Sequence, residues 1–429
     1  MRPLNILWIL TTQWRAQACG YAGDVNARTP SLDAFASESI NFSQAVTPHP
    51  FGPFARAALL TGQRSPRNGV VDYFDPLPKD AVTIAHRLGS AGFDTAFFGK
   101  WHLAQRDRSA PLVGEVHAKM VVPPEARGGF SFWEGFESGF QLVNPWLHGT
   151  NLPEPRRFDG YQSDVIFERA GEWIEKQNRQ PAPSPRAWFC VASVEPPHPP
   201  YDVLGAVEAS GIRLRSNVPA DTDVSARARR ELAGYYDQIA ATDRAIGRLL
   251  ARVDFSNTAV VFTSVHGDMH GSHGLFRKGW PHEESVRVPL LVRIPGQAPV
   301  QSHAAISLAD VYAASLALAG NDVSRAEVSP GIVVDSDAEI ASGRIHAGVS
   351  EFLKRREWAQ ISMPSVVKLP WQCDRPWRGV RSASRKLILN ADRTPWLFFD
   401  LQKDPEEKVN LAAVPEIRDE LSTIRDFVE

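Results

Sequence analysis

Short apolar segments alternate with helical segments along this chain as far as residue 320, and this alternation is its strongest constraint on fold. Such an order predicts an α/β fold with a large, mostly parallel sheet sandwiched between helices. The expected strands are Asn5–Leu10, Phe93–Phe98, Trp188–Val194, Thr258–Ser264 and Leu290–Ile294. The expected helices are one that begins at Pro30, followed by Pro53–Leu60, Ala81–Ser90, Tyr161–Lys176, Ala226–Val253 and Ser307–Ala319.

Capping residues support several of these helices. Thr29 followed by Pro30 is a typical helix start, Asp80 is an N-cap candidate for the third helix, and Gly62 is placed to end the second.

The alternation of strand-like and helical segments stops after Asn321. The strand-like pieces that follow, without alternating helices, are His346–Ser350, Ala359–Ser362, Gly379–Ser382 and Lys386–Leu389, and a helix is expected at Val414–Phe427. Strands followed by a helix predict a small α+β subdomain. We therefore expect a large α/β domain over residues 1–335 and a subdomain over 336–429 packed on it.

Charge excludes two classes of partner. The formal charge is −2, from 47 basic and 49 acidic residues, and no block of like charges stands out. Nucleic-acid binding and attachment to an anionic membrane therefore have no support.

The location expected from the sequence is cytoplasmic. No stretch is long and apolar enough for a membrane span, and Asn5–Leu10 is too short for the core of a signal peptide. Three widely spaced cysteines fit a reducing compartment better than a disulfide framework.

A series of short motifs follows one order along nearly the whole chain. They are Pro3–Leu7, Thr29–Asp33, Arg56–Gly62, Gly99–Leu103, Pro197–Pro200, His266–Met269, His273–Leu275, Glu283–Leu290 and Phe399–Leu401. Each is weak alone, but their collinearity resembles the sulfatase family of the alkaline phosphatase superfamily. The resemblance implies an alkaline-phosphatase-like fold and a site for a sulfate-sized anion.

The nucleophile motif of that family is altered here. In the family, Cys (or Ser)-x-Pro-x-Arg precedes Ala-x-Leu-Leu-Thr-Gly, and the Cys or Ser becomes a formylglycine whose hydrate attacks the sulfate ester. This chain has Gly52-Pro53-Phe54-Ala55-Arg56 at those positions. The arginine is present, and Gly52 stands where the nucleophile is expected.

The metal-binding half of the family site is also altered. The family places two aspartates after the first strand, where this chain has Thr12 and Gln13, and a third where it has Val265, next to His266. Calcium and magnesium need several hard oxygen ligands. The resemblance therefore implies that neither the usual metal nor another cofactor binds, and loss of cation and carboxylates together avoids unpaired buried charge.

The anion-binding half is complete. The resemblance assigns catalytic roles to Lys100, His102, His198 and His266, and substrate contacts to Arg56, Lys278, Gly52, Thr12 and Gln13. Lysine and arginine supply fixed charge, and histidine can transfer a proton to a leaving oxygen.

Each residue also has a plainer reading. Arg56, Lys100 and Lys278 are candidates for structural ion pairs, and a lone histidine is more often a satisfied polar side chain than a catalyst. The cluster of His266, His270 and His273 allows a transition-metal site, but its spacing is not diagnostic and favours a hydrogen-bonded loop.

Three functions from different classes remain. The first is a sulfatase, which with this site would need an atypical mechanism. The second, which we favour, is a metal-independent enzyme that uses lysine and histidine as acid and base on a small sulfated, phosphorylated or carboxylated molecule. The third is a non-catalytic relative that binds an anionic ligand or a partner protein.

Overall fold

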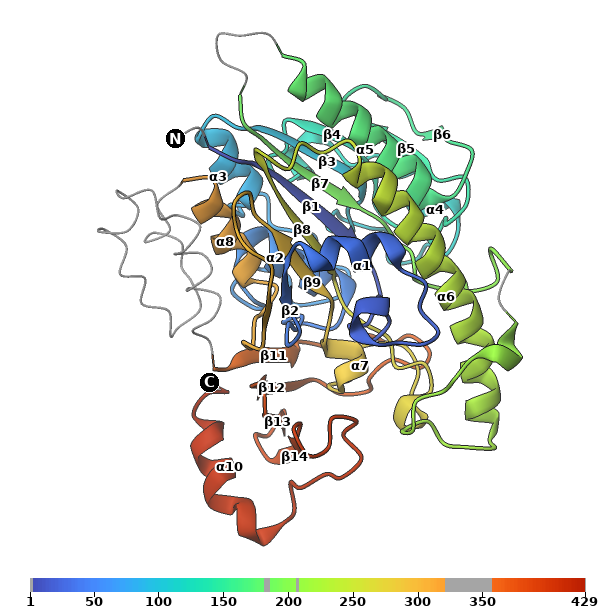
Figure 1. Cartoon of the computed structure of the whole chain (residues 1–429), viewed down its shortest axis with the longest axis vertical. Helices are drawn as coiled ribbons and strands as arrows, with labels where there is room; N and C mark the ends of the chain where they lie inside the picture. The colour runs from blue at the N-terminus through green and yellow to red at the C-terminus, as the bar shows by residue number, and fades with distance from the viewer. Residues whose placement is uncertain (1–2, 181–185, 206–207, 321–356, 429) are drawn as a thin grey trace.

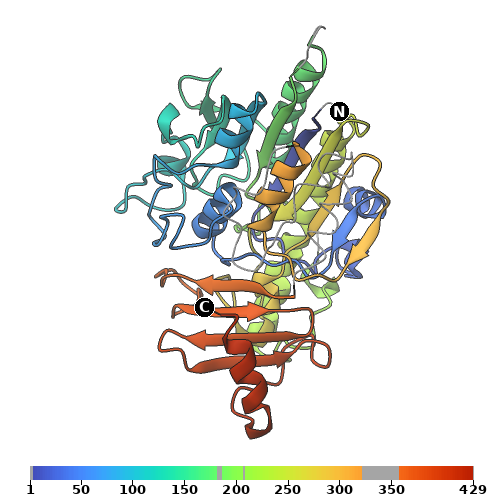
Figure 2. The ribbon, with the colours of Figure 1, turned by 90° about the vertical axis from the view of Figure 1, so that its left-hand side faces the viewer.

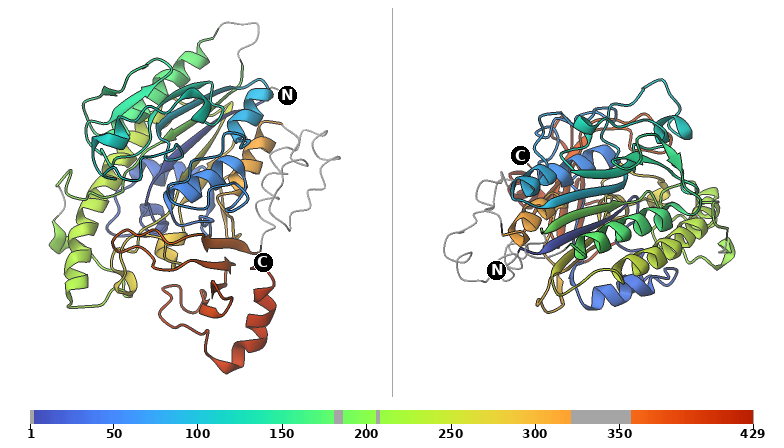
Figure 3. Two further views of the ribbon diagram at one scale, coloured as in Figure 1. Left: turned by 180° about the vertical axis from the view of Figure 1, so that it is seen from behind. Right: turned by 90° about the horizontal axis from the view of Figure 1, so that it is seen from above.

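The computed structural model describes residues 3–180, 186–205, 208–320 and 357–428. A large sheet of 10 strands has the order β10-β2-β9-β8-β1-β7-β3-β4-β5-β6, with helices on both faces (Figures 1 and 3). Its strands are β1 Asn5–Thr11, β2 Ile40–Phe42, β3 Asp94–Lys100, β4 Phe132–Phe136, β5 Trp146–Gly149, β6 Arg156–Arg157, β7 Trp188–Ser193, β8 Thr258–Ser264, β9 Leu290–Arg293 and β10 Val300–Ser302.

The central strands β8, β1, β7, β3 and β4 run parallel to one another. Antiparallel pairs occur towards the edges, where β9 pairs with β8 and β5 with β4. The predicted α/β class is confirmed, and the sheet is mixed at its edges.

Helices cover the two faces of the sheet in two groups. Helices α1 Pro30–Ser37, α5 Gln162–Asn178 and α6 Asp223–Leu250 lie on one face, and α2 Gly52–Thr61, α3 Ile84–Ser90 and α8 Asp310–Leu318 on the other (Figure 3). Short helices α4 Glu115–Ala118 and α7 Glu283–Val286 lie in connections.

Strand β1 contributes side chains to two separate hydrophobic cores, because its side chains alternate between the two faces of the sheet. Trp8 packs in the core under α2, α3 and α8. Its neighbours Leu7 and Ile9 pack in the core under α1, α5 and α6. A strand buried on both faces reads as a continuous apolar run, which is why β1 was readable from sequence.

A second, antiparallel sheet follows the large one and carries one helix (Figure 2). Its 4 strands have the order β11-β12-β13-β14. They are β11 Ala359–Met363, β12 Trp377–Arg381, β13 Arg385–Asn390 and β14 Pro395–Asp400, and the helix is α10 Arg418–Arg425. The small C-terminal subdomain expected from the sequence is therefore present, while the boundary expected at 335 lies outside the described residues.

The edge of this second sheet is hydrogen-bonded to a loop of the large domain. The backbone N–H of Ser362 in β11 donates to the carbonyl oxygen of Pro48 at 2.9 Å. Nδ1 of His49 lies 3.1 Å from the carbonyl oxygen of Ser362. The backbone N–H of Lys278 donates to Oε1 of Gln372 at 3.2 Å.

Several predicted element bounds need correction. The third helix begins at Ile84 and not at Ala81, because Thr83 and not Asp80 is its N-cap and accepts from the backbone N–H of His86. The C-terminal helix is shorter than Val414–Phe427, since a 3-10 turn occupies Pro415–Ile417 before α10.

Other parts of the prediction have different outcomes. Strands β2, β4, β5, β6, β10 and β14 were not predicted, and the strand expected at 346–350 lies outside the described residues. Among the helices that the structure describes, none is both long and apolar enough to cross a membrane.

Candidate functional site

The predicted site residues follow the carboxyl ends of four adjacent parallel strands. Thr12 and Gln13 follow β1, His102 follows β3, His198 lies beyond β7, and His266 lies beyond β8. Parallel neighbours end at the same edge of a sheet, which is where ligands bind in open α/β folds. The N-terminus of α2 adds Gly52 and Arg56, and the loop before α7 adds Lys278.

Arg56 joins the ends of three strands. Its Nη1 donates to the carbonyl oxygen of Lys100 and to Oγ of Ser193, both at 2.8 Å, and its Nη2 donates to Oγ1 of Thr12 at 3.0 Å. Its Nε is buried without a partner in the described chain. Burial lowers the pKa of Arg56 to about 10, so the guanidinium stays charged at neutral pH. Arg56 thus holds the strand ends together and keeps one N–H for a ligand.

Lys100 is paired with a carboxylate that sequence reasoning missed. Its Nζ lies 2.7 Å from Oε1 of Glu195, and both side chains are buried. Gln162 on α5 donates to the other carboxylate oxygen of Glu195 at 3.0 Å. Burial lowers the pKa of Lys100, and Glu195 opposes that shift. This pair holds one positive charge of the site in place and neutralises it.

Lys278 has neutral partners only. Its Nζ donates to Oε1 of Gln13 at 2.7 Å and lies 2.7 Å from Nε2 of His198. Nδ1 of His198 lies 2.9 Å from the carbonyl oxygen of Pro199. A carbonyl only accepts, so Nδ1 of His198 carries the proton and Nε2 accepts from Lys278. Both nitrogens of His198 are therefore engaged with protein.

Arg106 fixes the tautomer of His102. Its Nη1 lies 3.1 Å from Nε2 of His102, and its guanidinium lies 4.3 Å from the ring centroid of Tyr73. Because a guanidinium can only donate, Nε2 of His102 is the acceptor and Nδ1 carries the proton. Nδ1 is buried and has no partner in the described residues. Burial and the charge of Arg106 lower the pKa of His102 well below 6.5, which keeps the imidazole neutral.

His266 leaves an acceptor nitrogen unpaired in the described residues, whereas His102 leaves a donor N–H unpaired. Its Nδ1 lies 2.9 Å from the carbonyl oxygen of Gly267 and therefore carries the proton. Nε2 is buried and unpartnered within the described chain, so its lone pair is free. Burial and the charge of Lys278 lower the pKa of His266 well below 6.5.

This group of buried residues has more basic side chains than its carboxylates pair with. Glu195 pairs with Lys100, and Glu137 lies 3.4 Å from Nε of Arg106. Arg56 and Lys278 form no ion pair with a carboxylate in the part of the chain that the structure describes. Burial and the charge of Lys100 lower the pKa of Lys278 well below 10.5. An anionic ligand would hold Lys278 in its charged form beside Arg56.

The residues at the family's metal positions do not fit calcium or magnesium. Oγ1 of Thr12 donates to the carbonyl oxygen of Val194 at 3.0 Å and accepts from Arg56. Gln13 accepts the ammonium of Lys278, and its amide nitrogen donates to Asp268. Val265 is buried and apolar. A positive group thus faces the oxygen atom a cation would need, and the expectation of metal-free chemistry remains a prediction.

The three histidines proposed as a transition-metal cluster are not brought together. His270 lies between aromatic rings, with its centroid 5.2 Å from that of Tyr201 and 4.3 Å from that of Tyr235. His273 instead stacks on His282 at 4.4 Å.

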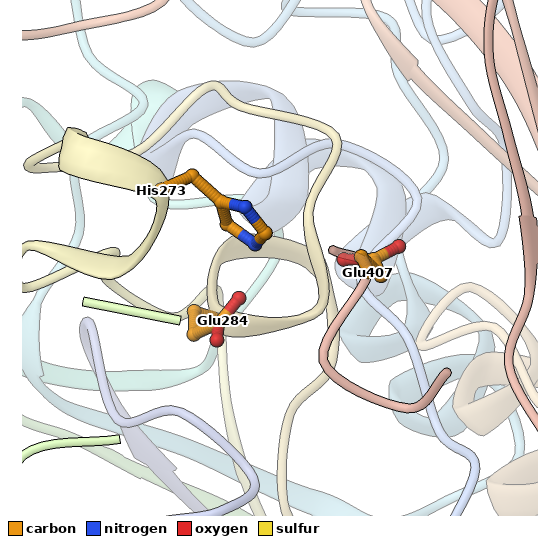
Figure 4. A group of neighbouring side chains, drawn as sticks. All are labelled: His273, Glu284 and Glu407. Atoms are coloured by element: carbon orange, nitrogen blue, oxygen red, sulfur yellow. The ribbon is translucent and has the colours of Figure 1, made fainter. Parts of the chain in front are cut away.

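Within the described residues, one group of three side chains has metal-ligand spacing, and it lies around His273. Possible ligand atoms of His273, Glu284 and Glu407 lie within 4.8 Å of one another (Figure 4). Nδ2 of Asn217 donates to both His273 and Glu284, at 3.2 and 2.8 Å. Nζ of Lys386 lies 2.6 Å from Oε1 of Glu407. These donors engage one acceptor atom of each side chain, while Oε2 of Glu284 is buried without a partner in the described residues. We interpret the group as part of a polar junction between the two sheets.

The sequence analysis identified the cationic residues but not the side chains that pair with them or hydrogen-bond to their partners. Glu195 lies three positions before His198 and Arg106 four after His102, so proximity in sequence was an available signal. Glu137, Gln162 and Tyr201 come from separate elements and had no such signal. No observation tests the assigned roles of the site residues, which stay predictions.

Comparison with known proteins was made over the whole chain. A family profile described as Sulfatase matches residues 4–321. The chain is 32% identical to the ulvan-active sulfatase of Formosa agariphila over 435 residues, which covers 96% of this chain and 78% of that protein.

Solved structures share the fold. That of yidJ from Bacteroides fragilis, a protein assigned as a sulfatase, has a TM-score of 0.80 at 24% identity and covers 99% of this chain and 94% of its own. The phosphonate monoester hydrolase of Agrobacterium radiobacter has a TM-score of 0.71 at 20% identity, with 100% and 96% covered.

Proposed function

The chain belongs to the sulfatase family, and from that premise we propose that it is a metal-independent enzyme acting on a small anionic molecule. Its substrate would carry a sulfate, phosphate or carboxylate group, and lysine and histidine would provide the acid and base. Relatives in this family are named as sulfatases, whereas this chain has Gly52 in place of the nucleophile.

One observation carries the proposal. Two buried cations lack a carboxylate partner, and beside them two histidines each keep one nitrogen free. Uncompensated buried charge is costly, so a protein that keeps it without a ligand loses stability. A bound anion removes that cost, and the free nitrogens are placed to exchange a proton with it.

Each residue of the site has a separate role in this proposal. Arg56 and Lys278 hold the anion, and Lys100 adds donors from its neutralised pair with Glu195. Nδ1–H of His102 donates to a ligand oxygen, and Nε2 of His266 accepts a proton. His198 orients Lys278, since both of its nitrogens are engaged. It is therefore a weaker acid–base candidate than the sequence suggested.

Three variants test this function. Titration calorimetry with inorganic phosphate and sulfate should detect binding that Lys278→Met weakens by roughly 10-fold or more, because a charge-assisted hydrogen bond contributes about 1.5–3 kcal/mol. His102→Ala should reduce both binding and any turnover found in a screen of aryl esters, and Lys100→Ala should weaken binding. Unchanged binding and turnover in His102→Ala would refute its role.

A non-catalytic binding protein is the second candidate, and the closed hydrogen bonding of His198, Thr12 and Gln13 favours it. Anion binding without turnover of any sulfate, phosphate or carboxylate ester would support it. Stoichiometric calcium together with aryl sulfate turnover would instead establish a sulfuric ester hydrolase and reject metal independence.

We also propose a cytoplasmic location. The cysteines Cys19, Cys190 and Cys373 are free and buried, which suits a reducing compartment. Fractionation of cells producing the protein tests this, and recovery outside the cytoplasm would reject it.

A further inference from the structure

We propose that the ligand of this pocket is an oxyanion that keeps one proton, such as the monoanion of a phosphate monoester, and that sulfate esters are disfavoured. The inference rests on the proposed anion site and names the chemical class that the site takes. It follows from which buried hydrogen-bond donors and acceptors of the site have no partner in the described residues.

The pocket offers donors at several points. Nε of Arg56 and Nδ1 of His102 are buried N–H groups without a partner in the described chain. Lys278 uses its ammonium towards Gln13 and His198, which leaves one of its three N–H bonds free. Any oxyanion, sulfate included, can accept from these groups.

The pocket also offers an acceptor that a sulfate ester cannot satisfy. Nε2 of His266 has a free lone pair because Gly267 fixes the proton on Nδ1. The aromatic ring of Phe51 lies 6.5 Å from the His266 ring and 5.4 Å from Nζ of Lys278, so both groups border one phenyl ring. Burial and then the charge of Lys278 lower the pKa of His266, as expected for groups that lie near each other. We therefore place a group that donates to His266 in the same anion site.

Protonation state separates the two ligand classes at equal charge. A sulfate monoester is a monoanion with no O–H group, whereas a phosphate monoester below its second pKa, about 6, is a monoanion with one O–H group. That O–H can donate to Nε2 of His266, while a sulfate ester leaves the buried lone pair unpaired. Sites with a buried polar group reject analogues that cannot pair with it.

Methyl phosphate and methyl sulfate are matched probes for this difference. At a pH of about 5.5 both are largely monoanions of similar size, and titration calorimetry on the full chain should give roughly 10-fold tighter binding of methyl phosphate. His266→Leu removes the acceptor and should bring the two affinities within about threefold, chiefly by weakening methyl phosphate. His266→Gln supplies an amide oxygen as acceptor and should retain part of the preference.

The outcomes separate the inference from the function on which it rests. Equal affinity for both probes in the wild-type protein, or a phosphate preference that His266→Leu leaves intact, overturns the inference and leaves anion binding in place. Absence of binding for both probes overturns the anion-binding function and the inference with it. Circular dichroism and the unfolding temperature of each variant distinguish a lost contact from a lost fold.

Discussion

Gly52 and His102 are so close that a Cβ atom on Gly52 would lie 2.8 Å from Nδ1 of the histidine. Gly52 is the first residue of α2 and is fully buried in the described structure. A larger residue at position 52 would therefore displace the side chain of His102. Nδ1 of His102 lies where a side chain on residue 52 would begin.

Gly52→Ala should reduce anion affinity roughly 10-fold with little loss of stability. The helical backbone accepts alanine, which favours helix by up to about 1 kcal/mol over glycine, whereas the new methyl group displaces His102. Calorimetry with inorganic phosphate and thermal unfolding measure the two effects.

Gly89→Ala is the matched control for this substitution. Gly89 lies in helix α3, is exposed, and has open space around the added methyl group. It should bind as the wild-type protein does and unfold at an equal or higher temperature. If Gly52→Ala also binds like the wild-type protein, Nδ1 of His102 does not contact the ligand.

Calcium should have no effect on the stability of this protein. Thr12, Gln13 and Val265 provide no carboxylate, and Lys278 occupies the amide oxygen of Gln13. A calcium site with a dissociation constant of about 10 μM would add about 2.7 kcal/mol at about 1 mM calcium. Thermal unfolding after dialysis against EDTA, and again with calcium added, checks this. A rise of several degrees with calcium, reversed by EDTA, would contradict it.

Lys386→Met should destabilise the junction between the two sheets by about 3–5 kcal/mol, because it leaves buried carboxylates without a counter-charge. Nζ of Lys386 lies 2.8 Å from Glu283 and 2.6 Å from Glu407, and the side chain is fully buried. Guanidinium unfolding at neutral pH gives the free energy.

The control for this loss is Lys403→Met, since Lys403 is 87% exposed and 3.9 Å from its nearest carboxylate oxygen. Its effect should stay below about 1 kcal/mol. Adding Glu407→Gln to Lys386→Met should recover part of the loss, and full additivity of the two changes would show that they do not interact.

Protonation of His49 should make the protein less stable in acid. Nε2 of His49 accepts from the backbone N–H of Ser65 at 3.0 Å, and Nδ1 donates to Ser362. Burial lowers its pKa from 6.5 to about 3. Between those values the unfolded chain binds a proton that the folded protein does not. The contribution is therefore complete above pH 6.5 and is lost, at about 1.4 kcal/mol per pH unit, as pH falls towards 3.

His49→Gln removes this titration and should flatten the dependence of unfolding free energy on pH by that amount, although it is less stable at pH about 7. Replacing the exposed His303 by Gln should leave the slope as it is in the wild-type protein. Equal slopes for His49→Gln and the wild-type protein would mean that His49 is not buried neutral.

The sequence was sufficient for the central strands β1, β3, β7 and β8, but not for β4. Runs such as Trp188–Val194 are apolar on both faces, and side chains after parallel strands necessarily meet at one edge. The resemblance to the sulfatase family, and not strand order, led us to expect Lys100, His102 and His198 at one site.

Contacts that depend on the folded geometry could not be predicted from the sequence. The choice between Asp80 and Thr83 as helix cap depends on which hydroxyl or carboxylate meets a free N–H, and both residue types are good caps. The tautomers of His102 and His266 depend on Arg106 and on a backbone carbonyl, which no spacing rule places. Strand β14 begins at Pro395, a residue that usually disfavours a strand, and it ends in the Phe399–Leu401 motif, so it was not recognised as a strand.

The hydrogen bonds between β11 and the loop at Pro48 have a consequence for how the pocket forms during synthesis. Ser362 and Gln372 support Pro48, His49 and Lys278 from positions far later in the chain. On the ribosome, the anion-binding segments emerge well before these supports have been translated. The nascent protein therefore holds an unfinished pocket until its second sheet is made, and a premature stop before residue 359 removes the supports altogether.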